Sequence, residues 1–470
     1  MIRTKSKQSI INEFRNVPIN DQRLVNRLIV TAEIIENQPE KSIPDACGDW
    51  ATTKATYQLF ANEKVTSEKI FSSHRLNTIE RIQKYPMVLL IQDTSTLDFT
   101  THKKTKGLGP YTTSKKAQGL LMHSVLAVSP TGVPLGLLYQ DIWAREKSPK
   151  YTKQNQHQEL PIEAKESYKW LKAMEGSLIG VPKPKLAVTV GDREADIFEF
   201  FQKARELECH LLVRAVRNRR ILEECKLLLN QIEQTPEAGQ CMVEIPRRSE
   251  ENLPPRQAKL SVRYCPVTVC PAHSWTKKPA GSIPLYVILA REIDSPEGEE
   301  PIEWLLLTTI PVGSLAEAVQ KVEWYRERWK IERFHYILKS GCSVENLQLE
   351  TKERLENAIA LYSIVAWRLA WLTYQARETP EFSCSIILEK HEWQSLYCVV
   401  NKTHTPTEDP PTLSEAVLLL AKLGGFLGRK HDGKPGVKVL WRGLQKLNEG
   451  LLFVEYFRSI QSSSQDMGNG

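Results

Sequence analysis

Two aspartates each follow a short apolar run that is typical of a buried strand. Asp93 follows MVLLIQ, and Asp192 follows LAVTVG. A carboxylate at the end of a strand is commonly a turn residue or a helix cap, so either one alone indicates little chemistry. Two carboxylates held close together repel each other unless a cation lies between them, and such oxygen ligands suit Mg²⁺ or Mn²⁺. If their strands are neighbours, the pair predicts a divalent-metal site.

A third carboxylate, Glu332, lies in a helical pattern that spans residues 314–339 and ends near Gly341. At ~100° per residue, a single ~60° arc of this helix carries four polar side chains, namely Tyr325, Arg328, Glu332 and Lys339. The opposite face carries an apolar stripe made of Trp324, Ile331, Phe334 and Leu338. We therefore expect the polar arc to face away from the core. An ordinary solvated face, with Arg328 paired to Glu332 one turn away, is the competing interpretation.

The order of the strands decides whether these acids can meet. From residue 86 the chain carries the strand-like runs MVLLIQ, LLMHSVLAVS and VPLGLLYQDIW, then a helix, the run LAVTV, a second helix and the run HLLVRAV. This βββαβαβ order is that of an RNase H-like mixed sheet, in which three antiparallel strands precede two parallel strands reached by helical crossovers. The first and fourth strands of that sheet are neighbours. The predicted fold class is therefore α/β, and Asp93 and Asp192 can share a site.

Other segments flank and interrupt this core. Residues 1–85 show helical periodicity, residues 238–303 are proline-rich and alternate like strands, and residues 376–470 are again helical. The core then consists of 86–237 and 304–375, with a β-rich insertion between the two parts. The N-terminal region fits either a phosphate-contacting module or a basic solvated face. Its basic residues include Arg3, Lys5, Lys7, Arg15, Arg23, Arg27, Lys54, Lys64 and Lys69.

Composition narrows the class of protein. The 470 residues are 41% hydrophobic and 25% charged, which is typical of a soluble protein with several domains. The net charge, 63 − 56 = +7, is spread over a long chain and does not by itself predict a polyanionic partner. The longest apolar runs are shorter than the ~20 residues that span a bilayer. The chain also starts without a secretory pattern, so we expect a cytosolic protein.

The nine cysteines are sparse and odd in number, which favours a reducing compartment over a disulfide framework. Cys265, Cys270 and His273 come nearest to a zinc cluster. They lack a fourth ligand and lie in a strand-like segment, so packing of the cysteines is the preferred interpretation.

The motifs together resemble one known family. The spacing Tyr325-x-x-Arg328-x-x-x-Glu332-x-x-x-x-x-x-Lys339 is similar to the Y-R-E-K motif of bacterial DDE transposases of the insertion-sequence-four type. Four further stretches resemble the same family in the same order, so the likeness covers nearly the whole chain. These stretches are IQDTSTLDF, GDREADIFEF, EWLLLTT and LAKLGGFLGRKHDG.

The resemblance implies a role for each candidate residue. The residues implied to bind metal are Asp93, Asp192 and Glu332. The residues implied to contact the DNA end are Tyr325, Arg328, Lys339, Arg214 and Trp304. Within this set, Trp304 would stack on a base flipped out near the cleavage point, and Arg214 would contact the terminal DNA. From the residues alone, a tryptophan in an apolar strand fits the core equally well, and an arginine in RAVRNRR fits a solvated surface.

The resemblance also implies an activity, which is cut-and-paste transposition with Mg²⁺, or Mn²⁺ as a substitute. The enzyme would nick the element's end, form and reopen a hairpin, and join the freed 3′ end to target DNA. Residues 1–85 would bind the terminal inverted repeats, residues 376–470 would form a homodimer in a synaptic complex, and the basic stretches 100–118 and 214–220 would contact phosphates. A nuclease that cuts without joining and an inactive, transposase-derived DNA-binding protein are the alternatives.

Overall fold

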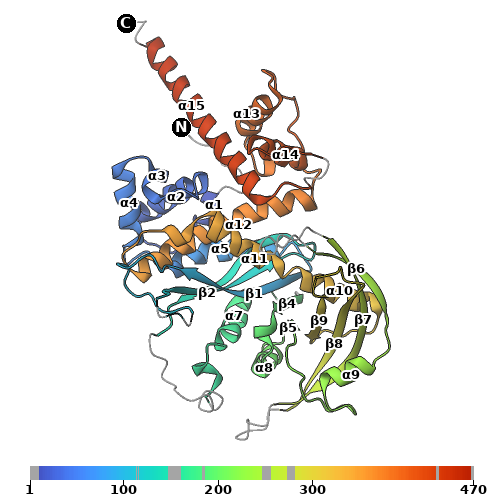
Figure 1. Cartoon of the computed structure of the whole chain (residues 1–470). Coiled ribbons are helices and arrows are strands. Elements are labelled where there is room, and N and C mark those ends of the chain that lie inside the picture. Colours follow the sequence, from blue (N-terminus) through green and yellow to red (C-terminus); the bar gives the residue numbers. More distant parts are fainter. Residues whose placement is uncertain are drawn as a thin grey trace.

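The described residues form a nine-stranded sheet, with helices on both of its faces (Figure 1). The structure is a computed structural model, and it describes residues 10–112, 114, 116–146, 160–182, 186–245, 256–271, 281–429 and 433–466. The strands follow the order β3-β2-β1-β4-β5-β9-β8-β7-β6 across the sheet.

Five strands at one side of the sheet form the RNase H-like core. β1 pairs antiparallel with β2 and parallel with β4, while β2 pairs antiparallel with β3 and β4 pairs parallel with β5. The predicted α/β fold with an RNase H-like mixed sheet is therefore confirmed. The five strands are β1 (Met87–Asp98), β2 (Gly119–Val128), β3 (Pro134–Trp143), β4 (Leu186–Gly191) and β5 (His210–Arg214).

The segment between the two parts of the core extends the same sheet. Three of its strands form an antiparallel meander, and a fourth strand, β9, joins this meander to β5 by antiparallel pairing on both sides. The added elements are α9 (Leu228–Gln234), β6 (Gly239–Ile245), β7 (Arg256–Val269), β8 (Ile283–Ile293) and β9 (Glu303–Thr308). β9 places Trp304 beside β5 and therefore close to the core acids.

The cysteines considered for zinc lie at this end of the sheet. Cys265 is in β7 and Cys270 directly follows it, whereas His273 lies outside the described residues. All nine cysteines are free thiols. Within the described ranges, no group of three His, Cys, Asp or Glu side chains is arranged to hold a metal ion.

Four of the described helices cover the two faces of the core sheet. α7 (Tyr168–Leu178) and α8 (Phe198–Glu206) pack on one face, and α5 (Ser67–Ile82) and α12 (Lys352–Glu378) pack on the other (Figure 1). The core is dense because these faces are apolar. For example, Trp170 of α7 and Phe200 of α8 are almost fully buried against each other.

Four further helices precede α5, and the first, second and fourth of them contact α12. They are α1 (Ile10–Glu13), α2 (Gln22–Asn37), α3 (Ile43–Cys47) and α4 (Trp50–Phe60). A buried ionic network fastens α1 to α5: Glu13 accepts hydrogen bonds from His74 at 2.6 Å and from Arg81 at 2.8 Å. These partners hold the pKa of Glu13 at about 2 although its burial acts in the opposite direction. Removing one partner would leave a buried charge uncompensated, so the loss of either partner should destabilise the packing of α1 on α5.

The sequence predicted one continuous helix over 314–339, with four polar residues on a single arc. That prediction is wrong, because the helix is interrupted. α10 (Leu315–Arg326) ends before Glu327, and α11 (Trp329–Tyr336) begins after Arg328. At this junction, hydrogen bonds join residues three apart and tighten the helix. After α11 the chain forms a wider π-helical turn (Ile337–Gly341). Both changes rotate later side chains relative to an ideal helix. The predicted apolar stripe is nevertheless buried throughout, with Ile331, Phe334 and Leu338 fully inaccessible.

The C-terminal part consists of α13 (Lys390–Asn401), α14 (Leu413–Leu423) and α15 (Val437–Asp466). α14 packs along α15, and both contact α12, while α15 projects away from the core (Figure 1). Among the described helices, none combines the length and the apolar character needed to cross a membrane.

Candidate active site

Asp93 and Asp192 lie at the same edge of the sheet on neighbouring strands. Ile91 of β1 pairs with Val190 of β4, and each aspartate lies two residues further along its own chain. Asp192 directly follows β4, where its carboxylate accepts a hydrogen bond from the backbone N–H of Glu194 at 2.8 Å and caps a short 3₁₀ turn. The parallel pairing predicted from the sequence therefore brings the two carboxylates together.

The charged form of the Asp93 side chain is disfavoured at its position in the fold. Its side chain is only 18% exposed, and it accepts one backbone hydrogen bond, from Thr94 at 2.9 Å. Burial raises the pKa of Asp93 to about 7, with Asp192 and Glu332 adding to this effect and Arg328 opposing it. Burial disfavours the charged form of a carboxyl group, and like charges nearby disfavour it further. A cation at this position would relieve both penalties.

Glu332 lies on α11 close to Asp93 and forms an ion pair with Arg328. The Arg328 Nη2 to Glu332 Oε1 distance is 2.5 Å, and the Glu332 side chain is 47% exposed. Although burial lowers it, the pKa of Arg328 is raised by Tyr325, Glu332 and Asp93. The pairing considered from the helical spacing is thus present, but the arginine also faces the Asp93 carboxylate across the gap between α11 and β1.

Tyr325 departs from the predicted outward orientation, because it is only 4% exposed. Its hydroxyl group interacts with both Arg214 of β5 and Arg328, and burial raises the pKa of this hydroxyl. Arg214 also donates from Nη2 to the backbone carbonyl of Glu303 at 2.8 Å. The prediction of a solvent-facing tyrosine is therefore wrong. Tyr325 instead belongs to the buried face of α10, where its hydroxyl group meets two guanidinium groups next to the acids.

Trp304 is buried in the same cluster. Its ring packs edge-on against Tyr325 at 5.4 Å and against Trp329 at 5.9 Å between centroids, and the residue is 5% exposed. The structure therefore places Trp304 in the core, which is one of the two positions considered from the sequence. A base could stack on this indole only after Tyr325 or Trp329 moves.

Lys339 lies in the π-helical turn and connects it to β1. Its ammonium group donates to the backbone carbonyl of Thr96 at 3.0 Å and lies 3.3 Å from Glu345, while Glu345 accepts from the N–H of Asp98 at 2.8 Å. π-helical turns inside helices are frequent at functional sites. Here the turn holds Lys339 three residues along β1 from Asp93.

Two positioning residues were not singled out from the sequence. Asp196 is almost fully buried, and it accepts from the backbone N–H groups of Val216 and Arg217 and from Arg219 Nε at 2.7 Å. It thereby fixes the basic stretch 214–220 beside the acids. The sequence could have indicated Asp196, because it belongs to the GDREADIFEF stretch that resembles the transposase family.

The second such residue is His335, whose Nδ1 lies 3.8 Å from Asp93 Oδ2. Burial lowers the pKa of His335 to about 3, so the ring is neutral at physiological pH. His335 lies about one turn after Glu332 on α11 and, unlike Glu332, belongs to the buried face of that helix.

The donor set suits a divalent cation. Asp93, Asp192 and Glu332 offer only carboxylate oxygens, which are the ligands preferred by hard cations such as Mg²⁺. Asp93 also has the raised pKa expected where a cation is needed for charge balance. Glu332 points to Arg328 in this structure, so complete ligation requires that carboxylate to turn toward the aspartates.

Three protein families match the chain along its length. The Transposase DNA-binding family matches residues 6–65, the Transposase DDE domain matches residues 166–368, and the Transposase Tn5 dimerisation domain matches residues 364–467. The chain belongs to the DDE transposases. It is similar to the Tn5 transposase and fits the insertion-sequence-four type. As a DDE transposase it is an enzyme that acts on DNA, with a DNA-binding region and a dimerisation region.

The DDE match begins after β1, so it includes Asp192 and Glu332 but not Asp93. One solved structure, titled "Cryo-EM structure of piggyBac transposase synaptic complex with hairpin DNA", aligns with 79% of this chain and 74% of that chain. The alignment has 10% sequence identity and a TM-score of 0.33, a likeness too remote to support an argument about the site.

Proposed function

We propose that this transposase excises a mobile element by a cut-and-paste route, in which Asp93, Asp192 and Glu332 hold divalent cations at the scissile phosphate. The main support is the buried Asp93, because burial and two neighbouring carboxylates raise its pKa, as expected where a cation is needed for charge balance. Mg²⁺ is the proposed ion because the ligands are all oxygens, and Mn²⁺ should substitute for it. When bound, such cations activate the attacking water or 3′-hydroxyl and stabilise the leaving oxygen.

The bond changes in this route balance without any further reactant. Water first attacks a phosphorus atom at the element's end, the P–O3′ bond breaks, and a 3′-hydroxyl and a 5′-phosphate result. That 3′-hydroxyl attacks a phosphorus atom of the opposite strand and displaces the 3′-oxygen of the flanking DNA, which gives a hairpin on the element's end. A second water attacks the hairpin phosphorus and displaces the element's 3′-oxygen, which leaves a 5′-phosphate on the other strand. The regenerated 3′-hydroxyl then attacks a phosphorus atom of the target DNA and displaces another 3′-oxygen.

The residues around the acids have proposed roles that follow from their contacts. Arg214 and Arg328 carry positive charge on both sides of the Tyr325 hydroxyl, and together they would hold the phosphates next to the scissile bond. Lys339 would contact the same strand from the β1 side. Trp304 would accept a flipped base after its aromatic neighbours move.

The flanking regions have proposed partners of their own. Residues 1–85 would bind the terminal inverted repeats, and 376–470 would pair two copies of the chain into a synaptic dimer, in agreement with the matched DNA-binding and dimerisation families. The domain limits 86–237, 238–303 and 304–375 are retained as part of this proposal. The enzyme would work on nucleoid DNA in the bacterial cytosol.

A cleavage assay on end duplexes tests this function. The DNA flanking the reading frame should contain paired inverted repeats, and these supply the substrate. With Mg²⁺, the purified protein should nick an end duplex at the repeat boundary, leave a random duplex intact and then produce a hairpin. Cleavage at random positions with no later joining would instead support the nuclease alternative. End binding with no cleavage in any divalent metal would support an inactive derivative.

A further inference from the structure

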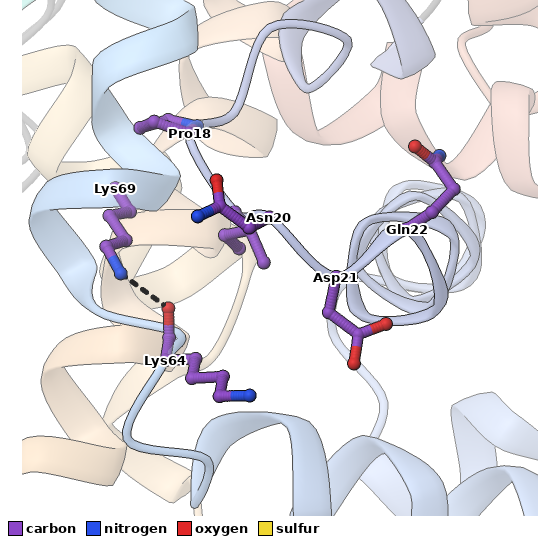
Figure 2. A pocket seen from close by; sticks show the side chains of 7 residues that line it. Pro18, Asn20, Asp21, Gln22, Lys64 and Lys69 are labelled. Atoms are coloured by element: carbon purple, nitrogen blue, oxygen red, sulfur yellow. Dashed lines mark hydrogen bonds between the residues drawn. The ribbon is translucent and has the colours of Figure 1, made fainter.

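A cleft of about 490 Å³ opens in the N-terminal helical region, and none of the three active-site acids lines it (Figure 2). It lies between the loop that leads into α2 and the segment that joins α4 to α5. Its volume is within the range of about 300–1,000 Å³ that is usual for ligand sites. The residues that line it are Pro18, Ile19, Asn20, Asp21, Gln22, Lys64 and Lys69.

Two lysines give this cleft its positive charge. Lys69 Nζ donates to the backbone carbonyl of Lys64 at 3.0 Å, which fixes the half-buried Lys69 at the wall of the cleft (Figure 2). Lys64 is exposed, and within the described part of the chain its ammonium group has no acceptor at hydrogen-bond distance. The neighbouring acids Glu63 and Glu68 do not line the cleft. One lysine is therefore held in place, and the other can reach a ligand.

The single carboxylate in the lining, Asp21, does not cancel this charge. It accepts three hydrogen bonds from Arg23, from the backbone N–H at 3.0 Å, from Nε at 3.2 Å and from Nη2 at 3.0 Å. These bonds lower the pKa of Asp21, and the nearby Lys64 ammonium group lowers it further. Asp21 therefore offsets part of the positive charge, but the two lysines outnumber this carboxylate and the lining keeps a net positive charge.

Helix orientation and uncharged polar groups add to this preference for an anion. α2 and α5, each of 16 residues, both begin beside the cleft, and the N-terminus of a helix carries a partial positive charge. Asn20 adds an exposed carboxamide, a group that donates hydrogen bonds to phosphate and sugar oxygens, whereas Gln22 Nε2 already donates to Asn26 Oδ1 at 2.9 Å. The floor is apolar, formed by Pro18 and the buried Ile19.

We infer that this cleft holds a backbone phosphate group of the terminal-repeat duplex, between Lys64 and Lys69. The inference rests on the proposed end-binding function and adds to it the group that is bound and the residues that bind it. A duplex is favoured over a free anion because the DNA-binding match, residues 6–65, includes Lys64 and all five lining residues that precede it. The contact would set the register of the repeat without reading its bases.

The salt dependence of end binding tests the inference, with the Lys64→Gln/Lys69→Gln double variant and with Lys390→Gln in α13 as a control of the same type of substitution. Each phosphate that the protein neutralises adds about one to the slope of log Kd against log salt. Because Lys64 and Lys69 would neutralise one phosphate between them, we expect the double variant to bind the end duplex about tenfold more weakly at low salt and to lose about one from that slope. The Lys390→Gln protein should keep both values. The Lys64→Arg/Lys69→Arg variant should keep the slope, because it keeps the charge.

A scan with single methylphosphonate substitutions then locates the phosphate. One or two adjacent neutral linkages should weaken wild-type binding several-fold and leave the double variant unaffected. An unchanged slope together with an unchanged methylphosphonate profile would overturn the inference. So would competition by millimolar inorganic phosphate, lost in the double variant, with no sensitive linkage in the duplex. If wild-type protein does not distinguish an end duplex from a random duplex, the proposed function fails first and independently.

Discussion

Replacing Asp93 by Asn should stabilise the metal-free protein while it abolishes cleavage. The pKa of Asp93 is about 7 instead of 3.8, chiefly because the carboxyl group is buried. Each factor of ten in proton affinity corresponds to ~1.4 kcal/mol, so ionising Asp93 in the folded protein costs about 4 kcal/mol. The asparagine side chain of the Asp93→Asn variant cannot ionise, and its carbonyl oxygen can keep the hydrogen bond from Thr94.

The pH dependence of this effect has a defined sign. Between pH 3.8 and pH 7 the folded protein holds a proton on Asp93 that the unfolded chain releases, so this group's contribution to stability falls as pH rises through that window. The stability gained by Asp93→Asn should therefore grow by about 3 kcal/mol between pH 5 and pH 8. Other carboxyl groups titrate in both proteins and cancel in the difference.

Urea unfolding of both proteins in EDTA at pH 5 and pH 8 measures this difference. Asp98→Asn on the same strand is the control with the opposite sign, because hydrogen bonds from Thr100 and Tyr111 and the charge of Lys339 together outweigh burial and lower the pKa of Asp98. That variant should be less stable than wild type at pH 8. The reasoning is refuted if Asp93→Asn is no more stable than wild type at pH 8, or if the gap does not change with pH.

Three further predictions concern the rest of the site and the C-terminal helices. Glu332→Gln should abolish nicking in Mg²⁺ and leave end binding within about twofold in a gel-shift assay, since affinity comes from basic contacts. Normal nicking would remove Glu332 from the metal ligands. Trp304→Ala should cost ~3–5 kcal/mol of stability, because the ring fills the space between Tyr325 and Trp329. A loss of hairpin formation that exceeds the loss of nicking would reveal stacking in addition, whereas equal losses with a lowered melting temperature would limit Trp304 to packing. Deletion of the residues after 378 should leave a monomer that binds one end, and sedimentation of a two-end complex by this fragment would place the dimer contact elsewhere.

The meeting of Asp93 and Asp192 was predictable because it follows from local signals. Each aspartate comes directly after an apolar run, and the βββαβαβ order makes the two strands parallel neighbours. Asp192 follows β4 as expected, whereas β1 continues past Asp93 to Asp98, so the expectation that Asp93 ends its strand was wrong. The burial of the α11 stripe was predictable for the same reason, since helical periodicity depends on a few residues in sequence.

The phase of the site helix was not predictable. It depends on whether hydrogen bonds join residues three, four or five apart at Glu327, Arg328 and the π-helical turn, and tertiary contacts decide this. Tyr325 precedes the break and shares a buried face of α10 with Ala318 and Val322. The predicted apolar stripe was set mainly by residues after the break, so a single continuous arc placed Tyr325 away from the core. The bonds of Asp196 to residues about 20 positions away were also invisible to periodicity, because no pattern within one element reports contacts between loops.

Reconstituted transposition tests the central claim most directly. The purified protein and MgCl₂ are incubated with a supercoiled plasmid that carries a marker between two copies of the flanking inverted repeats, together with a target plasmid. The account predicts excised, double-ended marker DNA and insertions flanked by short target duplications, and it predicts that Asp192→Asn produces neither. Intact donor plasmid after incubation with wild-type protein that binds both ends and the metal would contradict it.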